Sequence, residues 1–338
     1  MKILVTGGLG YIGSHTVVAL QQSGFEVSIV DNLSNSTIDV LEGIAKITGI
    51  TPQFKFLDLR DKSEVHHYFK SHKEIDGVIH FAASKAVGES VENPLLYYEN
   101  NVNSLVNLLQ ECKKQGIHNF IFSSSCTVYG EPDGLPITEN APIKKATSPY
   151  GNTKQISEEI LFDTSKVSHL KAIALRYFNP IGAHASVEIG ELPLGVPQNL
   201  VPFITQTAYG IREELSVFGD NYPTQDGSCI RDYIHVVDLA DAHVVAINRL
   251  LAKKNTTAFE VFNIGTGAGS SVFEVIQTFN QVTDQNLKYK VVDRRPGDVI
   301  AVYADTTKAN TVLGWKAKFS LADALASAWK WELKIRKE

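Results

Sequence analysis

The chain has 338 residues, more than one hydrophobic core usually serves, so two domains are expected. Its 37 acidic and 32 basic side chains give a formal charge of −5, which argues against nucleic acid and anionic membranes as partners. Three cysteines, Cys112, Cys126 and Cys229, cannot make a disulfide framework and lack the spacing of a zinc or redox motif. Because no apolar stretch suits a signal peptide or a membrane span, we expect a cytoplasmic protein.

Short β-branched runs alternate with longer amphipathic stretches along most of the chain. The runs, which are typical of buried parallel strands, are Ile3–Thr6, Val27–Val30, Phe54–Leu57, Gly77–Phe81, Phe120–Phe122, Ala172–Leu175 and Val261–Ile264. The helix-length segments between them include Gly13–Ser23, Leu95–Gln115 and Tyr150–Lys166. This alternation predicts an α/β fold built on a doubly wound parallel sheet of the Rossmann type.

The pattern changes near Asn179, where prolines begin to separate shorter elements. We therefore predict a first domain over residues 1–178 and a smaller, mixed α/β domain over residues 179–338. Since Val261–Ile264 still has the pattern of a buried strand, the chain is expected to return to the first sheet around residues 234–265.

The first predicted strand runs into a glycine-rich turn that leads into a helix. Gly7, Gly10 and Gly13 allow a tight turn, close approach of backbone N–H groups to a pyrophosphate and close packing of the helix; an ordinary βα turn is the alternative. Asp31 ends the second strand, where a carboxylate can accept hydrogen bonds from both hydroxyls of an adenosine ribose or simply cap a loop. It would repel a 2′-phosphate, and Asn32–Asn35 offer no cation to bind one, so NAD is favoured over NADP.

Polar residues also follow the third and fifth predicted strands. Asp58 lies after the third strand and could bond an adenine amino group, although a helix N-cap is the alternative. Ser123 and Ser125 end the fifth strand, which places hydroxyl groups at the carboxyl edge of the sheet, where doubly wound folds bind ligands. Turn chemistry alone could also explain these serines.

A tyrosine and a lysine share one face of the predicted helix Tyr150–Lys166. Ser148 is suited to cap this helix and Pro149 to occupy its first position, which puts Tyr150 in the first turn and Lys154 one turn later. The lysine charge and the helix N-terminus are expected to lower the tyrosine pKa from about 10, making Tyr150 a general base while Ser125 relays or orients the proton. With 12 tyrosines, about one such Tyr–Lys spacing is expected by chance, so the motif gains weight only beside the glycine loop.

Together these motifs resemble the extended short-chain dehydrogenase/reductase family over essentially the whole chain. Further matching stretches are 81–90, 97–102, 123–130, 175–180, 226–227, 231–236 and 294–298. The resemblance implies that the first domain binds NAD, with Lys85 over the pyrophosphate, and that the second binds a nucleotide sugar. The implied NAD contacts are Gly7, Gly10, Tyr11, Ile12, Gly13, Asp31, Asn32, Leu33, Ser34, Asn35, Ser36, Asp58, Leu59, Phe81, Ala82, Ala83, Ser84, Lys85, Asn100, Ser123, Tyr150, Lys154 and Phe178.

The substrate contacts implied by the resemblance belong to a UDP-hexose. They are Ser125, Tyr150, Asn179, Asn199, Leu200, Phe218, Arg231, Tyr233, Arg295, Asp298 and Val302. Arg231 and Arg295 can clamp a diphosphate, and Phe218 and Tyr233 supply flat apolar faces. An internal Arg231–Asp232 ion pair and a core position for Phe218 are the structural alternatives.

The activity implied by the resemblance is inversion at C4 of the hexose, which interconverts UDP-glucose and UDP-galactose through a 4-keto intermediate and belongs to galactose metabolism. A homodimer formed through the helices around Leu95–Gln115 and Tyr150–Lys166 is implied as well. Dehydratases and decarboxylases of the family carry acidic residues directly after the strand-five hydroxyls, where this chain has Cys126 and Thr127. The alternatives are another NAD-dependent sugar-nucleotide enzyme, either an epimerase of a different sugar or a dehydrogenase, and a non-catalytic NAD-sensing protein. The ten histidines lack metal-ligand spacing, so no metal is expected.

One position departs from the family pattern. Four residues after Asp298, the strictest relatives place a tyrosine that walls off the hexose 2-position, whereas this chain has Val302. Tyr303 is adjacent, but successive side chains of an extended segment point to opposite faces. We therefore predict that N-acetylhexosamine substrates are accepted too, with core packing of Val302 as the alternative.

Overall fold

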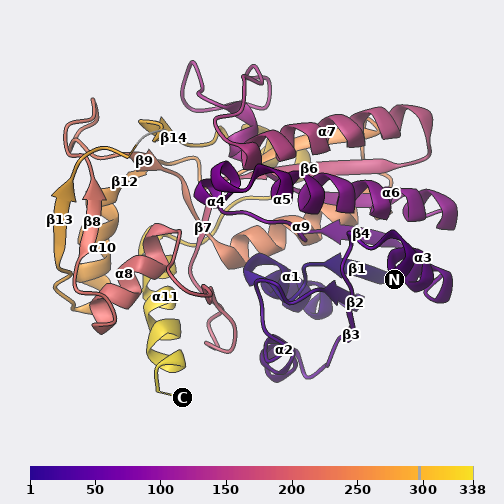
Figure 1. The fold of residues 1–338 in the computed structure, drawn as a ribbon, viewed down its shortest axis with the longest axis horizontal. Coiled ribbons are helices and arrows are strands. Elements are labelled where there is room, and N and C mark those ends of the chain that lie inside the picture. The colour runs from indigo at the N-terminus through magenta and orange to yellow at the C-terminus, as the bar shows by residue number, and fades with distance from the viewer. Residues whose placement is uncertain (296–297, 338) are drawn as a thin grey trace.

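The central feature of the computed structural model, which describes residues 1–295 and 298–337, is a parallel sheet. Within these residues it has seven strands in the order β11-β6-β5-β4-β1-β2-β3 (Figure 1). The strands are β1 (Lys2–Thr6), β2 (Glu26–Asp31), β3 (Gln53–Phe56), β4 (Gly77–His80), β5 (Asn119–Ser125), β6 (Lys171–Tyr177) and β11 (Phe259–Ile264), and all neighbours are parallel. The predicted doubly wound sheet is confirmed.

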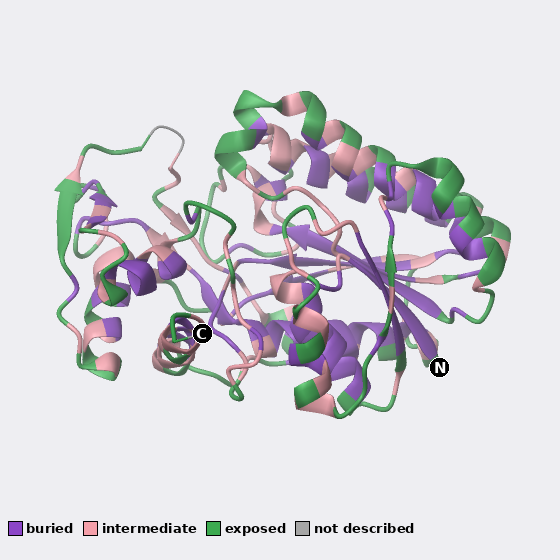
Figure 2. Ribbon diagram, turned by 60° about the horizontal axis from the view of Figure 1, so that its bottom comes forward, coloured by how far each residue is buried: buried purple, intermediate pink, exposed green. Residues whose placement is uncertain are grey.

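Helices cover both faces of this sheet, and its strands are buried between them (Figure 2), apart from the edge strand β3. The expectation that Phe54–Leu57 is a buried strand is wrong, because β3 has a neighbouring strand on one side only and most of its residues are exposed. The helices are α1 (Tyr11–Gln22), α2 (Val40–Thr48), α3 (Lys62–Ser71), α4 (Val87–Glu92), α5 (Pro94–Tyr97), α6 (Ser104–Gln115), α7 (Pro149–Val167) and α9 (Val236–Leu251), with a π-helix at Tyr98–Asn103 and a 3₁₀-helix at Cys126–Tyr129. Successive strand side chains point to opposite faces, so Ile3 and Val5 pack in one apolar layer and Leu4 in the other. The predicted helix Leu95–Gln115 is present as α5, the π-helix and α6 in succession.

Smaller sheets and three further helices form a second lobe, at the left of Figure 1. Its strands are β7 (Asn179–Ile181), β8 (Leu215–Phe218), β9 (Ile230–Arg231), β10 (Tyr233–His235), β12 (Ser270–Ser271), β13 (Tyr289–Val292) and β14 (Ala301–Val302). Its helices are α8 (Leu200–Tyr209), α10 (Val272–Thr283) and α11 (Leu321–Ile335). A π-helix at Ala309–Leu313 packs against β11 and α9 beside the large sheet instead. Ile204, Val217, Phe279 and Leu325 belong to the separate core of the second lobe.

The chain passes between the two lobes more than once. After β10 in the second lobe, α9 packs against α1, and β11 then pairs with β6 at the edge of the large sheet. The division of the chain into domains at residues 178 and 179 stays a prediction. Among the described residues, no helix is long and apolar enough to cross a membrane.

Candidate active site

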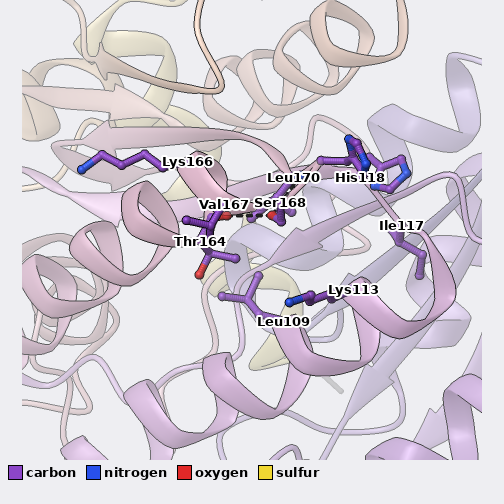
Figure 3. Close-up of a pocket in the computed structure, with 10 residues that line it drawn as sticks. Leu109, Lys113, Ile117, His118, Thr164, Lys166, Val167, Ser168 and Leu170 are labelled. Atoms are coloured by element: carbon purple, nitrogen blue, oxygen red, sulfur yellow. Dashed lines mark hydrogen bonds between the residues drawn. The ribbon is translucent and has the colours of Figure 1, made fainter.

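A cavity of about 480 Å³ lies between the carboxyl ends of α6 and α7 (Figure 3). Its lining includes Ile117 and His118, just before β5, and His169 and Leu170, just before β6, so it lies at the amino edge of the sheet. None of the predicted site residues lines it. They gather instead at the carboxyl edge, where the glycine loop after β1 and the segment after β4 flank the point at which the strand order reverses.

The glycine loop is packed too closely for larger residues. A Cβ on Gly13 would lie 2.2 Å from the carbonyl oxygen of Gly7, and one on Gly7, which has a positive φ of 69°, would lie 2.7 Å from the nitrogen of Ala82. The N–H of Ser14 bonds the carbonyl of Gly10 as α1 begins. A tight turn at a helix N-terminus, beside the point where the strand order reverses, is the geometry that a dinucleotide pyrophosphate requires, so these residues fit NAD.

Asp31 lies beside this loop at the end of β2. Its carboxylate accepts hydrogen bonds from the N–H groups of Leu9 at 3.1 Å and Leu33 at 2.9 Å and from the hydroxyl of Ser36 at 3.1 Å. These bonds hold the carboxylate at the edge of the glycine loop and leave it further acceptor capacity for ribose hydroxyls. Ser34 and Asn35 are exposed beyond it.

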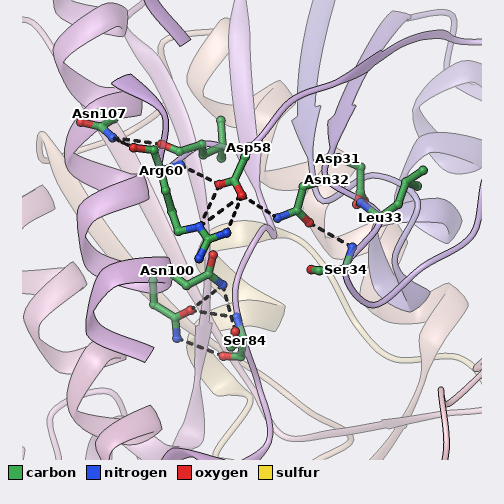
Figure 4. Close-up of polar contacts among 11 residues, drawn as sticks. Asp31, Asn32, Leu33, Ser34, Asp58, Arg60, Ser84, Asn100 and Asn107 are labelled. Atoms are coloured by element: carbon green, nitrogen blue, oxygen red, sulfur yellow. Dashed lines mark hydrogen bonds and ion pairs between the residues drawn. The ribbon is translucent and has the colours of Figure 1, made fainter. Parts of the chain in front are cut away.

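Asp58 forms a bidentate ion pair with Arg60 and also accepts a hydrogen bond from Asn32 at 3.3 Å (Figure 4). The Arg60 hydrogen bonds are the main cause that lowers the pKa of this half-buried carboxyl to about 2. The alternative reading as an N-cap is wrong, because Asp61 caps α3 by accepting from Ser63 and Glu64. Leu59, next to Asp58, is buried in the core. Arg60 was not predicted as a site residue, because its pairing with Asp58 depends on side-chain conformation.

The segment after β4 is fixed by amide side chains from the π-helix (Figure 4). Asn101 accepts from the N–H of Ser84 at 2.8 Å, and Asn100 donates to the Ser84 hydroxyl at 2.9 Å. Phe81 and Ala82 both donate backbone N–H groups to the carbonyl of Thr6, which holds the segment against the glycine loop. Ala83 is half-buried and Lys85 is exposed.

Tyr150 and Lys154 project from the first two turns of α7, as predicted. Ser148 caps the helix by accepting from Gly151 at 3.1 Å, and Pro149 occupies its first turn. The Lys154 ammonium is buried, donates to the carbonyl of Ser123 at 2.6 Å and lies 5.8 Å from the centre of the Tyr150 ring. Tyr150, Lys154 and the end of β5 therefore come together at one place.

The expected lowering of the Tyr150 pKa is not found. Burial raises this pKa above its ordinary value, and the Ser125 hydroxyl acts in the opposite direction. Burial also lowers the pKa of Lys154 to about 8, although the charge of Glu158 opposes this shift. Desolvation, which disfavours both the phenolate and the ammonium, is the largest cause of both shifts and is the reason that the expected lowering was wrong.

Two hydroxyl groups from the neighbouring strands β5 and β6 meet at the carboxyl edge of the sheet. Ser123 and Tyr177 share a hydrogen bond between their side chains, and the tyrosine is buried. Ser125 pairs in register with Tyr177 and accepts a hydrogen bond from the N–H of Thr127 at 3.2 Å. Tyr177 belongs to the matched stretch 175–180 but was not identified as a site residue, because this contact depends on strand register.

The predicted diphosphate-binding residues lie on the second lobe. Arg295 donates to Asp298 at 2.7 Å and lies 5.4 Å from the ring centre of Phe218, and Arg231 lies 4.0 Å from Asp298. The Arg231–Asp232 ion pair does not form, because the Asp232 carboxylate accepts from Thr266, Gly267 and Ala304 instead. Phe218 is 41% exposed, so it is not a core residue. Pro296 and Gly297 of the matched stretch lie outside the described residues.

The other predicted substrate residues are spread along the boundary of the two lobes. Asn179 starts β7 and pairs with Tyr233 of β10, which is buried in the core of the second lobe. Asn199 and Leu200 lie at the start of α8, and Asn199 donates to Glu191 at 2.7 Å. Glu191 was not predicted as a site residue, because its contact with Asn199 depends on the tertiary structure.

Val302 and Tyr303 point in different directions. Val302 packs against a cluster that contains Phe178 and Tyr129, beside Cys126. The ring of Tyr303 lies on the other side, where a Cβ on Gly269 would come within 3.0 Å of it. In the described part of the chain no group of three side chains is arranged to bind a metal ion.

Comparisons with known proteins agree with this architecture. The sequence model of the family described as GDP-mannose 4,6 dehydratase matches residues 4–328. UDP-glucose 4-epimerase of Bacillus subtilis is 49% identical over 98% of this chain and 97% of its own length. The crystal structure of UDP-glucose 4-epimerase from Stenotrophomonas maltophila, with bound NAD and formylated UDP-arabinopyranose, covers 100% of this chain and 99% of its own with a TM-score of 0.96 and 46% identity. The structure of the UDP-Glc/GlcNAc 4-epimerase of Campylobacter jejuni covers 98% of this chain and 99% of its own, with a TM-score of 0.85 and 38% identity. By its sequence and its fold, this chain belongs to the UDP-glucose 4-epimerase family, within the extended short-chain dehydrogenase/reductases.

Proposed function

We propose that this protein interconverts UDP-glucose and UDP-galactose with bound NAD and thereby serves galactose metabolism. The observation that carries the proposal is the meeting of Ser125, Tyr150 and Lys154 beside the glycine loop. Several solved relatives were crystallised with NAD, which supports the same cofactor here. NAD, when bound, accepts the hydride from C4 of the hexose and returns it.

Residues of this chain then transfer the proton and stabilise the charge that develops. Tyr150 takes the proton from the C4 hydroxyl as hydride leaves, which gives a 4-keto sugar. After the sugar has rotated to present its opposite face, Tyr150 returns the proton. Ser125 hydrogen-bonds the C4 oxygen. Lys154 supplies a buried positive charge close to the ring, which favours the phenolate against the effect of burial.

Retention of the keto sugar requires a firm hold on UDP and a loose hold on the hexose. Arg231 and Arg295 can bind the diphosphate, since they share Asp298 as a partner and are held near one another by it. Phe218, exposed next to Arg295, offers a face on which a uracil ring can stack.

The environment of Val302 supports a broader substrate range. Val302 and Cys126 pack against the same cluster, which contains Phe178, and Cys126 directly follows Ser125. We therefore infer that Val302 contributes to the wall of the hexose site. An isopropyl group in place of a phenol ring leaves space on the scale of an acetamido group. The protein therefore also epimerises UDP-N-acetylglucosamine, the second sugar named for the Campylobacter jejuni relative.

The helices over one face of the sheet form a homodimer interface. Val91 is 62% exposed on α4, Leu95 is 81% exposed on α5 and Phe162 is 47% exposed on α7. Apolar side chains gathered on neighbouring helices favour self-association. Sedimentation of the wild type and of Leu95→Glu tests this, with a dimer expected only for the wild type; a monomeric wild type would contradict the proposal.

The decisive experiment analyses the cofactor and the product together. Protein purified without added nucleotide is denatured, and NAD or NADH is expected in the supernatant, because a cofactor that left in each cycle would strand the keto sugar. The same preparation is expected to form UDP-galactose from UDP-glucose. Finding NADP alone, or net conversion of free NAD to NADH with product accumulation, would instead identify an ordinary dehydrogenase.

A further inference from the structure

Glu191 lies where the predicted cofactor and substrate residues approach each other. Its Oε1 accepts a hydrogen bond from the amide of Asn199 at 2.7 Å and lies 3.6 Å from the ammonium of Lys85. Its negative charge also acts on Tyr11 of the glycine loop, where it adds to the effect of burial in raising the tyrosine pKa. One carboxylate thus faces the glycine loop, the segment after β4 and the start of α8.

The loop that carries Glu191 is firmly anchored. A Cβ on Gly190 would lie 2.5 Å from the ring of Trp331, so glycine is required for this ring of α11 to pack against the loop. The Trp331 indole N–H donates to the carbonyl oxygen of Glu191 at 2.8 Å, and Ala183 forms an isolated bridge with Gly190. The backbone is therefore held at Gly190 and at Glu191 itself.

The side chain of Glu191 is largely shielded from water, with an exposed fraction of 11%, whereas that of Lys85 is 49% exposed. A carboxylate that is shielded from water must find hydrogen-bond donors or a counter-charge within the protein. A long, exposed lysine side chain has many conformations, so holding it in one of them costs entropy. The proximity of Glu191 restricts the lysine, and the Asn199 bond restricts the amide at the start of α8.

We propose that Glu191 is a positioning residue that orients Lys85 toward the cofactor and Asn199 toward the nucleotide sugar, so that one carboxylate serves both sites. This inference rests on the proposed function, because it takes the ligands of Lys85 and Asn199 from it. Glu191 touches neither ligand in this scheme and acts only through the two side chains that it holds.

The two arms of this arrangement can be separated chemically. Glutamine has the shape of glutamate and keeps an oxygen that accepts from Asn199, but it lacks the charge that attracts Lys85. Glu191→Gln is therefore expected to shorten the half-life of bound NAD by about tenfold and to leave the Kd for UDP within about threefold of the wild type. Glu191→Ala is expected to shorten the half-life of bound NAD and to weaken the affinity for UDP, each by about tenfold.

Glu188 provides a matched control on the same loop. Its carboxylate pairs with Lys46 of α2 at 3.6 Å and with Lys334 of α11 at 2.6 Å, away from both sites. Glu188→Gln makes the same change of charge and is expected to leave NAD release and UDP affinity unchanged. An equal loss in Glu188→Gln would assign the effect to loop stability and overturn the inference.

A double-mutant cycle with Lys85 completes the test. NAD release after gel filtration and UDP binding by calorimetry are measured for the wild type, Glu191→Gln, Lys85→Met and the double variant, and Glu191→Gln is expected to have no further effect once Lys85 is absent. If the losses of the two single variants add in the double variant, Glu191 and Lys85 act independently, and the inference is overturned. Tighter NAD binding in Glu191→Gln would also overturn it, because it would show that the Glu191 charge only repels the cofactor. A wild type that binds neither NAD nor UDP would overturn the proposed function itself, and with it this inference.

Discussion

The ammonium group of Lys154 donates a hydrogen bond of 2.6 Å to the backbone carbonyl oxygen of Ser123, and this bond joins α7 to the end of β5. Ser125 lies two residues further along that strand, and Tyr150 lies one turn earlier on that helix. The lysine therefore fixes the spacing between the tyrosine and the serine, in addition to supplying charge.

The role of the phenol group is tested by Tyr150→Phe. Removal of the hydroxyl leaves the ring and the packing of α7 in place but removes the group that exchanges a proton with the sugar. We expect kcat to fall by about a thousandfold, while the Kd values for NAD and UDP stay within about threefold. Steady-state kinetics and calorimetry measure these quantities, and near-normal turnover would refute the assignment of Tyr150 as the base.

The buried ammonium is expected to make stability depend on pH. Burial lowers the pKa of Lys154 to about 8 from 10.5, so between these values the unfolded chain binds a proton that the folded chain has lost. The contribution of this group to the free energy of unfolding therefore rises with pH in this window, by up to about 1.4 kcal/mol per pH unit. Urea unfolding of the wild type and of Lys154→Met from pH 7 to 10 should show a difference that grows with pH; parallel curves would contradict it.

A buried ion pair links α7 to β6. Glu158 of α7 accepts from Arg176 of β6 at 2.9 Å and from the hydroxyl of Ser124 at 2.5 Å. Glu158→Gln leaves a buried arginine without its counter-charge, so we expect the free energy of unfolding to fall by about 3–5 kcal/mol. We also expect a lower kcat in the folded protein, because the Glu158 charge raises the pKa of Lys154.

Glu260 supplies the control for this effect on activity. It forms a similarly buried pair with Arg249, at 2.7 Å, on the edge strand β11. Glu260→Gln should destabilise the protein to a similar extent, with kcat unchanged at a temperature where both variants are folded. Equal values of kcat in the two variants would show that Glu158 acts only on stability.

Substrate range is expected to depend on position 302. Val302→Tyr restores a bulky ring beside Phe178 and Cys126, so it should lower kcat/KM for UDP-N-acetylglucosamine by at least about tenfold and leave UDP-glucose nearly unaffected. Tyr303→Val changes the neighbouring side chain, which points toward Gly269, and should leave both values as they are. Position 302 is not the gate if the wild type ignores the N-acetyl substrate or if the tyrosine leaves its use unchanged.

The sequence was sufficient to predict the elements that repeat a simple pattern. The strands of the large sheet are short β-branched runs, and the helix that begins at Pro149 has both a cap and a proline at its first position, so local composition determines them. The glycine loop is equally readable, because only glycine fits the approach of Gly13 to Gly7.

Contacts that depend on tertiary structure were not predictable. The bond between Ser123 and Tyr177 depends on the register of two strands, and the pairing of Asp58 with Arg60 depends on one of several side-chain conformations. Glu191 is held by Trp331, which lies 140 residues later in the chain. The direction of the Tyr150 pKa shift depends on how completely other segments bury the phenol group.

The position of β11 beside β6 has a consequence for biosynthesis. When β6 leaves the ribosome at residue 177, its outer edge has no neighbour until residues 259–264 have been made and α9 has packed against α1. At ordinary elongation rates this interval is on the order of ten seconds. An open strand edge can pair with other nascent chains. Aggregation during synthesis should therefore be most sensitive to substitutions in residues 178–258, which separate β6 from β11.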